Sequence, residues 1–510
     1  MCQPVAKQYP TRVLVVQANE TLRIISRDQL SREGGPIRYA TLSHAWGNHM
    51  PIQTTIETKP IFEKSIPEEL LPLTFKDAVS TTRALDIPYL WIDSLCIVQD
   101  DPNDWQVEAS EMENTFSGGT INIAASDALD STGGCFDPND DSARLVANDT
   151  STSGQKVNID TIGTASRDPR VFVYQHENES RSTMIRFQTS TPRRIQSQKH
   201  LSSRGWVLQE EVLSPRTVHC MKSEIYWQCK CSYKTQSGQT LAPSEVFLHP
   251  ADFNIEYSRR KERMWYEWIE DYSTRTFTFP SDRTAAIAGI TNSYQKMTGH
   301  SPLLGSWKES FTEGLLWIRL GSKRPVGVLG MPSWTWLSCN SPVVFDLWGR
   351  GLSKDKYTKE DHVVLCTYDL TWTGLANVSN VQSSVLIIKG PIKDLCFRIA
   401  PDNWSHPPYF ELEGEELDSS SPRPWSCGGQ FDDAGVTCDA FTTYTCLLIR
   451  SYSDLQAKFC RETFLILELV RSLPVDVTEQ LPSYRRIGVG FSYSDSGRFS
   501  LAEVKKLRLC

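Results

Sequence analysis

The sequence contains no hydrophobic run that approaches the roughly 20 apolar residues needed to cross a bilayer. Its first residues also lack the apolar core of a secretory signal peptide. Positive charge is not in excess, since 53 Lys and Arg stand against 61 Asp and Glu for a net charge of −8. This balance gives no electrostatic case for nucleic-acid binding. We therefore expect a cytoplasmic protein with no membrane span and no nucleic-acid partner.

Several familiar catalytic and ligand-binding patterns are also missing. There is no Gly-x-Ser-x-Gly elbow, and no glycine-rich fingerprint opens a helix after a strand. Ser43 and His44 are adjacent on an expected strand and should point to opposite faces, which argues against a hydrolase triad with Asp93. The 14 cysteines are scattered and are expected to be mostly buried thiols. A loose group does not match common zinc spacings, so no metal site is predicted: His219, Cys220, Cys229 and Cys231.

The chain does contain enough residues for two or three domains. Its first part alternates strands and helices, with strands expected at 12–18, 22–25, 39–43, 89–92 and 120–125. Helices are expected at 73–85 and from Asn103 or Asp104 onward. This alternation is typical of an α/β domain with a parallel sheet and flanking helices.

Residues 87–126 form the block around which the rest of the chain is organised. A short apolar strand ends at Asp93, and in open α/β sheets ligands bind beyond the carboxyl ends of strands. One face of the following helix is apolar: Trp105, Ala109, Met112 and Phe116. Glu108 and Glu113 flank this stripe, a position that allows partial burial and a raised pKa.

Composition and residue spacing also predict the secondary structure of the later parts of the chain. Residues 137–200 are polar and predict a long insertion with one hairpin near 171–174. A short helix ended by Pro215, two strands, three helices and a series of short alternating strands follow in that order. The second and third of those helices are expected at 282–294 and 311–320. We therefore predict four parts: a hairpin lead-in (1–38), an α/β domain (39–235), a helical extension (236–330) and a β-rich region (331–510).

Three motifs occur in order along the first half of the chain. Leu42–Gly47 reads Leu-Ser-His-Ala-Trp-Gly, Trp91–Gln99 reads Trp-Ile-Asp-Ser-Leu-Cys-Ile-Val-Gln, and Arg204–Glu210 reads Arg-Gly-Trp-Val-Leu-Gln-Glu. Together they resemble the HET domain of fungal heterokaryon-incompatibility proteins, over about residues 39 to 230. The resemblance implies a role in nonself recognition and regulated cell death when unlike hyphae fuse. It also implies a fold related to TIR domains, some of which assemble and cleave NAD.

The resemblance also suggests a candidate active site. Glu108 would stabilise an oxocarbenium-like ribosyl centre as nicotinamide leaves, and Asp93 would orient the substrate or bind a ribose hydroxyl. Alternatively, Glu108 lies on a solvated helix face and Asp93 caps the turn through backbone N–H groups. The candidate substrate-binding residues are the other motif positions: Ser43, His44, Trp46, Gly47, Gln99, Arg204, Trp206 and Glu210.

Two of these assignments have a structural alternative. Arg204 can bind a phosphate through its guanidinium. Alternatively, Arg204 or Arg216 can form an internal salt bridge with Glu210 or Asp93. The tryptophans can stack on a nicotinamide or adenine ring, or they can belong to the core. His44 also departs from the family pattern, in which an aromatic residue is common at that position.

The resulting hypothesis is a HET-domain effector that cleaves NAD on self-association, with NAD as a substrate and no cofactor. An unknown incompatibility partner protein would trigger it. Two alternatives stay open: a non-enzymatic signalling module, and a HET-like fold repurposed for fungal secondary metabolism. One open cleft lined by Asp93, Glu108 and Arg204 would favour an enzyme. Burial of the same residues in mutual salt bridges would favour the module.

Overall fold

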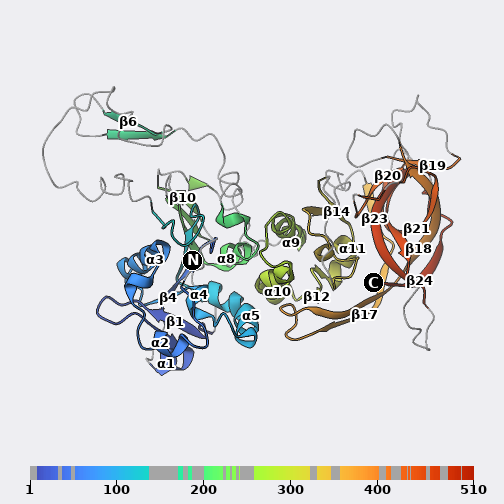
Figure 1. Cartoon of the computed structure of the whole chain (residues 1–510). Helices are drawn as coiled ribbons and strands as arrows, with labels where there is room; N and C mark the ends of the chain where they lie inside the picture. Colours follow the sequence, from blue (N-terminus) through green and yellow to red (C-terminus); the bar gives the residue numbers. More distant parts are fainter. Residues whose placement is uncertain are drawn as a thin grey trace. The chain divides into compact units, whose positions relative to one another are not determined.

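In the computed structural model, the chain folds into two compact units (Figure 1). The first comprises Met1–Glu256, Arg275–Phe277 and Ala285–Ser293, and the second comprises Tyr257–Thr274, Thr278–Thr284 and Tyr294–Cys510. The structure describes residues 8–32, 37–47, 52–136, 171–175, 182–186, 200–221, 225–229, 232–236, 240–241, 258–321, 330–345, 357–400, 409–414, 427–433, 435–436, 438–454, 460–470, 481–495 and 497–510. Within these ranges no helix is long and apolar enough to cross a membrane. The four-part division made from the sequence stays a prediction.

The first unit is built on a nine-stranded sheet with the order β11-β10-β9-β8-β5-β3-β4-β1-β2. Its strands are β1 (Arg12–Val15), β2 (Arg23–Ser26), β3 (Tyr39–Ser43), β4 (Tyr89–Trp91), β5 (Ile121–Ala125), β8 (Arg216–Cys220), β9 (Ile225–Cys229), β10 (Tyr233–Thr235) and β11 (Thr240–Leu241). The central strands β8, β5, β3 and β4 pair in parallel. The outer strands pair antiparallel. The sheet is therefore mixed, and the expectation of a parallel sheet holds only for its centre. Short hairpin connections make β1–β2 and β8 to β11 antiparallel, and β1 also pairs antiparallel with β4.

Helices cover both faces of the central strands. Every residue of β3, β4 and β5 is buried, as expected of parallel strands packed on both sides. The Tyr39 hydroxyl donates to the Thr115 carbonyl oxygen of α5 (Pro102–Gly118) at 2.8 Å. His44 comes five positions after Tyr39, so its side chain points to the opposite face of the sheet. The centre of its ring lies 4.9 Å from the centre of the Phe75 ring in α3 (Leu73–Ala84). Because side chains alternate along a strand, α5 lies on one face and α3 on the other.

The predicted helices of this unit are confirmed, with small shifts at their ends. Helix α3 buries Phe75, Val79 and Thr82, as predicted. Helix α5 begins slightly earlier than predicted because the Asp101 side chain accepts from the backbone N–H of Asn103 at 2.9 Å and Pro102 takes the first helical position. The remaining helices are short: α1 (Arg27–Arg32), α2 (Lys59–Phe62), α4 (Asp93–Cys96) and α8 (Val207–Leu213).

Most of the polar insertion predicted at 137–200 is outside the described residues, which include its hairpin and residue 200. Strands β6 (Val171–Gln175) and β7 (Ser182–Arg186) pair antiparallel, which confirms the hairpin predicted near 171–174.

Two of the three predicted later helices are confirmed, as α9 (Ser258–Ser273) and α10 (Ala285–Thr298). The third, predicted at 311–320, is wrong. Only the turn α11 (Phe311–Gly314) forms there, and β14 (Trp317–Arg319) then pairs with β15 (Val343–Phe345). A Cβ at Gly314 would lie 1.9 Å from the Ser306 hydroxyl oxygen, so the chain is pressed closely against β13 (Ser306–Trp307), which pairs with β12 (Pro302–Leu303). This tertiary packing and strand pairing override the local helical pattern.

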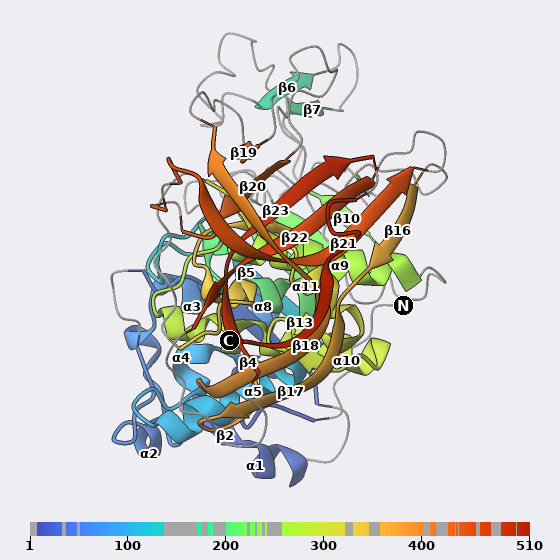
Figure 2. The ribbon, with the colours of Figure 1, turned by 90° about the vertical axis from the view of Figure 1, so that its right-hand side faces the viewer.

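The β-rich region predicted for the end of the chain is confirmed, with longer strands than expected. They are β16 (Tyr357–Asp361), β17 (Val364–Trp372), β18 (Val381–Ile399), β19 (Phe410–Leu412), β20 (Cys427–Phe431), β21 (Thr442–Asp454), β22 (Cys460–Leu469), β23 (Ser483–Ser494) and β24 (Glu503–Leu509). Strand β18 pairs with both β21 and β24, and β22 and β23 complete the circuit. The sheet therefore closes on itself, as the curved strands in Figure 2 show. Buried phenylalanines fill its interior, among them Phe397, Phe410 and Phe464.

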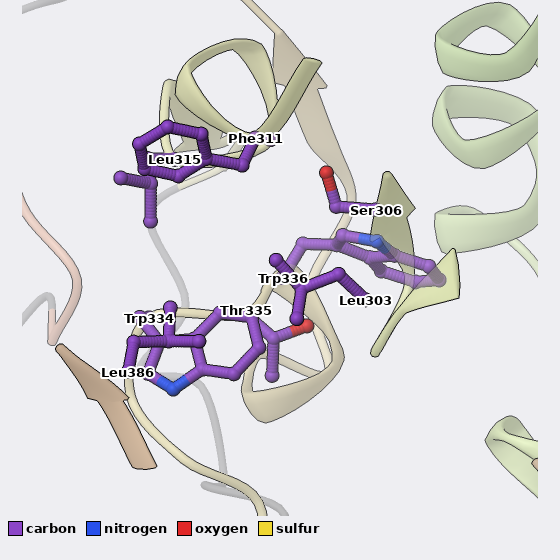
Figure 3. A pocket seen from close by; sticks show the side chains of 9 residues that line it. Leu303, Ser306, Phe311, Leu315, Trp334, Thr335, Trp336 and Leu386 are labelled. Carbon is purple, nitrogen blue, oxygen red and sulfur yellow. The ribbon is translucent and has the colours of Figure 1, made fainter. Parts of the chain in front are cut away.

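The second unit has an apolar pocket of its own (Figure 3). Its lining residues are Leu303, Ser306, Phe311, Gly314, Leu315, Trp334, Thr335, Trp336 and Leu386. The Trp336 indole N–H donates to the Gly305 carbonyl oxygen at 2.7 Å, and the Thr335 hydroxyl donates to that of Leu304 at 2.7 Å. The polar groups of these two residues therefore bond to backbone, and the aromatic rings form the walls.

A buried arginine joins β14 to the β-rich part of this unit. The Arg486 guanidinium donates to the carbonyl oxygens of Leu315 and Trp317, each at 2.6 Å, and lies 3.6 Å from the centre of the Trp317 ring. Its Nε donates to Asp432 Oδ2 at 3.0 Å. Arg486 is 2% exposed, so these contacts satisfy a cation that is almost completely removed from water.

We predict that Arg486→Ala lowers the stability of the second unit by about 3–5 kcal/mol, because Asp432 loses its cationic partner. The adjacent Arg485→Ala is the matched control, since Arg485 pairs with Glu468 at the surface and such pairs contribute about 0–1 kcal/mol. Hydrogen exchange of β20 to β24 in the full chain measures the difference. Equal protection in the two variants would contradict a structural role for Arg486.

Candidate functional site

The three sequence motifs meet where β3 and β4 end. Arg204 Nη1 donates to the carbonyl oxygen of His44. The Trp46 indole N–H donates to Asp93 Oδ2 at 2.9 Å, and Ser43 hydrogen-bonds Glu210. Six residues thus form what we call the strand-end cluster: Ser43, His44, Trp46, Asp93, Arg204 and Glu210. This edge of the sheet, beyond the carboxyl ends of parallel strands, is where α/β folds bind ligands.

A chain of hydrogen bonds crosses the sheet beneath the cluster. The Thr41 hydroxyl donates to Asn122 Oδ1 at 3.0 Å, and Asn122 Nδ2 donates to the Ser43 oxygen at 3.0 Å. The Ser43 hydroxyl has two acceptors within reach, Asn122 Oδ1 at 3.1 Å and the Glu210 carboxylate. Sequence reasoning missed Asn122, although a buried polar residue within the apolar strand β5 was a usable signal.

Glu210 is the most perturbed carboxyl group of the strand-end cluster. Its side chain lies in α8, and the residue is 8% exposed. Burial raises the pKa of Glu210 to about 7, while the hydrogen bond from Ser43 and the charge of Arg204 act in the opposite direction. A carboxyl group with such a pKa can accept or release a proton near neutral pH.

His44 is buried and uncharged. Burial lowers its pKa to about 4, against the opposing influence of Asp93. Its Nδ1 lies 3.7 Å from Asp93 Oδ1, which is too long for a hydrogen bond, and neither ring nitrogen has a hydrogen-bond partner among the described residues. His44 packs towards α3 whereas Ser43 bonds towards α8, so the two do not form the basis of a triad.

Asp93 fixes the turn that follows β4. Its Oδ1 accepts from the backbone N–H of Ser94 at 2.6 Å, while Oδ2 accepts from Trp46. The Gln99 side chain donates to the carbonyl oxygens of Asp93 and Ile97, each at 3.1 Å, and so closes the same turn. The turn-capping alternative for Asp93 is therefore observed. Its side chain is nevertheless 30% exposed, which leaves it open to a ligand.

Glycine is required at the end of the first motif. Gly47 has φ +64°, and a Cβ there would lie 2.3 Å from the Cβ of Asp130. Only glycine combines this backbone conformation with such a close approach. Gly47 therefore shapes the turn that carries Trp46.

The third motif is held by residues 275–277. The Gly205 N–H donates to the Thr276 carbonyl oxygen at 2.9 Å, and a Cβ at Gly205 would lie 2.0 Å from the Phe277 ring. The Trp206 ring packs edge-on against Trp105, with 6.0 Å between ring centres. These contacts give both the glycine and the tryptophan of the motif a packing role.

Glu108 lies in a separate ionic group. Its Oε1 accepts from the Thr11 hydroxyl and, at 3.2 Å, from Arg12 Nη2. Arg12 also donates to Asp104 Oδ2 at 2.5 Å and to the Cys96 carbonyl oxygen at 2.6 Å. Glu108 is 1% exposed, which contradicts the alternative of a solvated helix face. Burial raises its pKa to about 8.

The structure thus brings Asp93 and Arg204 together but not the full set predicted from the sequence. Asp93 and Arg204 flank His44, whereas the contacts of Glu108 are with β1 and its own helix. Arg216, considered as a salt-bridge partner, instead donates to the Thr120 carbonyl oxygen at 3.0 Å. In the part of the chain that the structure describes, no group of three or more His, Cys, Asp or Glu side chains could hold a metal ion.

A comparison with protein-family models finds a match over part of the chain. Residues 39–210 match the family model described as Heterokaryon incompatibility protein (HET). The matched segment begins at the first residue of β3 and ends at Glu210, so it contains every member of the strand-end cluster. None of the curated proteins and none of the solved structures matches the chain.

We predict that Gly205→Ala destabilises the first unit by about 1–3 kcal/mol or more, because the new methyl group would overlap the Phe277 ring. Gly119→Ala is the matched control, since its Cβ would meet Thr41 at an ordinary 3.4 Å. Urea unfolding of the two variants provides the comparison. Equal midpoints would show that Phe277 moves aside at little cost.

We predict that Glu108→Gln is more stable than the wild type and that this difference in stability grows as pH rises from about 5 to about 8. The folded-state pKa of about 8 lies above the ordinary value of 4.5, so the contribution of the protonated carboxyl is complete below pH 4.5 and lost as pH rises through 8. At pH 8 the free energy of unfolding of the variant should exceed that of the wild type by on the order of a few kcal/mol. Thermal unfolding across this range measures it, with Glu111→Gln on the same helix as control. A gain that does not change with pH would mean that Glu108 is ionised throughout.

Proposed function

Since the chain carries a HET domain over residues 39–210, we propose that it is an effector of heterokaryon incompatibility that brings about regulated cell death. The HET match indicates the role in incompatibility. The observation that supports an effector site is the strand-end cluster, where all three motifs converge on one edge of the sheet. The effector acts in the cytoplasm and is activated by self-association in response to an incompatibility partner protein.

The proposed chemistry is cleavage of NAD at this cluster. Asp93 faces the ribosyl carbon, because its side chain is the partly exposed carboxylate of the cluster. The bond from C1′ to the nicotinamide nitrogen breaks, and its electron pair leaves with nicotinamide. Water then adds to the oxocarbenium-like carbon and gives its proton to Glu210.

Two other residues would bind the substrate. Arg204 uses one N–H group for His44, and its remaining donors can bind the pyrophosphate. Trp46 can stack on a base, since its indole is held in place by Asp93 and is only half-buried. This assignment moves the catalytic carboxylate from Glu108 to Asp93 and Glu210, because Glu108 is enclosed by Thr11 and Arg12.

A second candidate function is a non-enzymatic signalling module. It is favoured by the hydrogen bonds on both oxygens of Asp93 and by the burial of Glu210, which suit groups that hold the three motifs together. In that case the cluster stabilises the HET domain, and the surface of the domain binds a partner.

The test is nicotinamide release from NAD by the purified full chain, with and without a crowding agent that promotes assembly. We expect release by the wild type, a loss of about 100-fold or more in Asp93→Asn, and little change in Glu108→Gln. Circular dichroism confirms that the variants are folded.

Two other outcomes would favour a different catalytic residue or the signalling module. Loss in Glu108→Gln with activity retained in Asp93→Asn would place the catalytic site at the helix α5 carboxylate instead. No release by folded wild-type protein under any of these conditions would reject NAD cleavage and leave the signalling module.

A further inference from the structure

Strand β17 forms one edge of the large sheet in the second unit. Among the described residues it pairs only with β18, on one of its two sides. Every residue of β17 is exposed or half-buried, and Val364 and Tyr368 are 62% and 41% exposed. Along the described part of the chain, the backbone N–H and C=O groups on the other side of β17 are therefore open to a further strand.

The same edge lacks the features by which proteins usually block strand pairing. Strand β17 contains no lysine, arginine or proline, and Asp369 is its only charged residue. Its pairing with β18 is regular over residues 367–371, between an irregularity on either side. This regular segment is the part of the edge that a second strand can extend.

Strands β17 and β18 continue together as a two-stranded ribbon beyond the closed part of the sheet (Figure 2). Strand β24 pairs with β18 only from Leu386 onward, so among the described residues the segment 381–385 has β17 as its only neighbouring strand. Isolated two-stranded pairs are marginally stable in water, and a third strand stabilises them. The ribbon therefore gains stability from a strand that pairs with the open edge of β17.

We propose that β17 pairs with β17 of a second copy of this chain, antiparallel about a two-fold axis at Leu370. In this register Leu370 lies opposite its own counterpart, and Tyr368 lies opposite Trp372 of the second copy. Asp369 lies opposite Thr371 of the second copy, so no two charges of like sign are directly opposed. The two ribbons then form one four-stranded sheet with an isologous interface.

The side chains on the two faces of β17 favour this register. The Thr371 and Ser383 hydroxyl groups hydrogen-bond at 2.7 Å, so Thr371 and Asp369 lie on the face of the ribbon that carries Ser383. Tyr368 and Leu370 lie on the other face. A two-fold axis at Asp369 would place two carboxylates directly opposite each other, which is unfavourable. An axis at Leu370 matches apolar with apolar side chains on one face and Asp369 with Thr371 on the other.

This interface deepens the proposed function by giving self-association a surface. Its role in activation rests on that proposed function, whereas the pairing of the strands does not. One pair of short strands is small compared with the interface of a permanent dimer, so association should be weak and should depend on protein concentration. Sedimentation measures it without NAD, so a failure of this proposal and a failure of NAD cleavage are distinguishable.

The experiment is sedimentation velocity of the full chain over a wide range of protein concentration. Thr371→Lys places an ammonium group opposite Asp369 of the second copy, twice in each dimer, and should lower the dissociation constant roughly five-fold. Thr371→Glu places a carboxylate there and should raise the dissociation constant by a similar factor. Combining Thr371→Glu with Asp369→Lys exchanges the two charges and should restore association. Leu501→Glu is the matched control, since Leu501 is 95% exposed in the turn before β24.

Two results would overturn the proposal. Wild-type chain that sediments as a monomer at every concentration would exclude the dimer and leave the edge of β17 to an extended segment of a different protein. A dimer that responds to neither Thr371→Lys nor Thr371→Glu would place the interface elsewhere. If a variant does not fold, hydrogen exchange of the wild type decides, because the amides of β17 should become more protected as protein concentration rises.

Discussion

Burial of the Glu210 carboxyl group at the ends of β3 and β4 is the constraint on which the first unit depends. A carboxyl group removed from water must find hydrogen-bond donors or positive charge. Ser43 supplies a hydrogen bond and Arg204 supplies charge, and Arg204 in turn binds the His44 carbonyl oxygen. Meeting this requirement joins the first and third motifs, which are about 160 residues apart in the chain.

The ionic group around Glu108 supplies partners to a buried carboxyl group in a different way. Glu108 is more deeply buried than Glu210, and its donors are Arg12, the first residue of β1, and the preceding Thr11. Arg12 is shared between Glu108, Asp104 and a carbonyl oxygen, so one cation supports both the acid-rich turn and helix α5. A carboxyl group enclosed in this way suits a structural role, whereas Asp93 keeps part of its surface open.

Much of the fold and part of the site follow from local patterns. The hairpin β1–β2, the strands β3 to β5 and the helices α3 and α5 were predictable because apolar periodicity and capping residues act within a few positions. Asn122, Phe277 and Thr11 were not predictable as partners of the candidate site residues. Each reaches its partner from a distant segment, and no spacing in the sequence encodes that contact.

The sequence by itself determined the resemblance to the HET family, the order of the motifs and the position of Asp93 at the end of a strand, because these properties belong to contiguous residues. Only the tertiary structure decided that Glu108 is enclosed, that residues 311–320 do not form a helix and that β1 pairs antiparallel with β4. The physical reason is that burial and pairing depend on which distant segments are brought together, and the free energy of those contacts exceeds the local preferences of the chain.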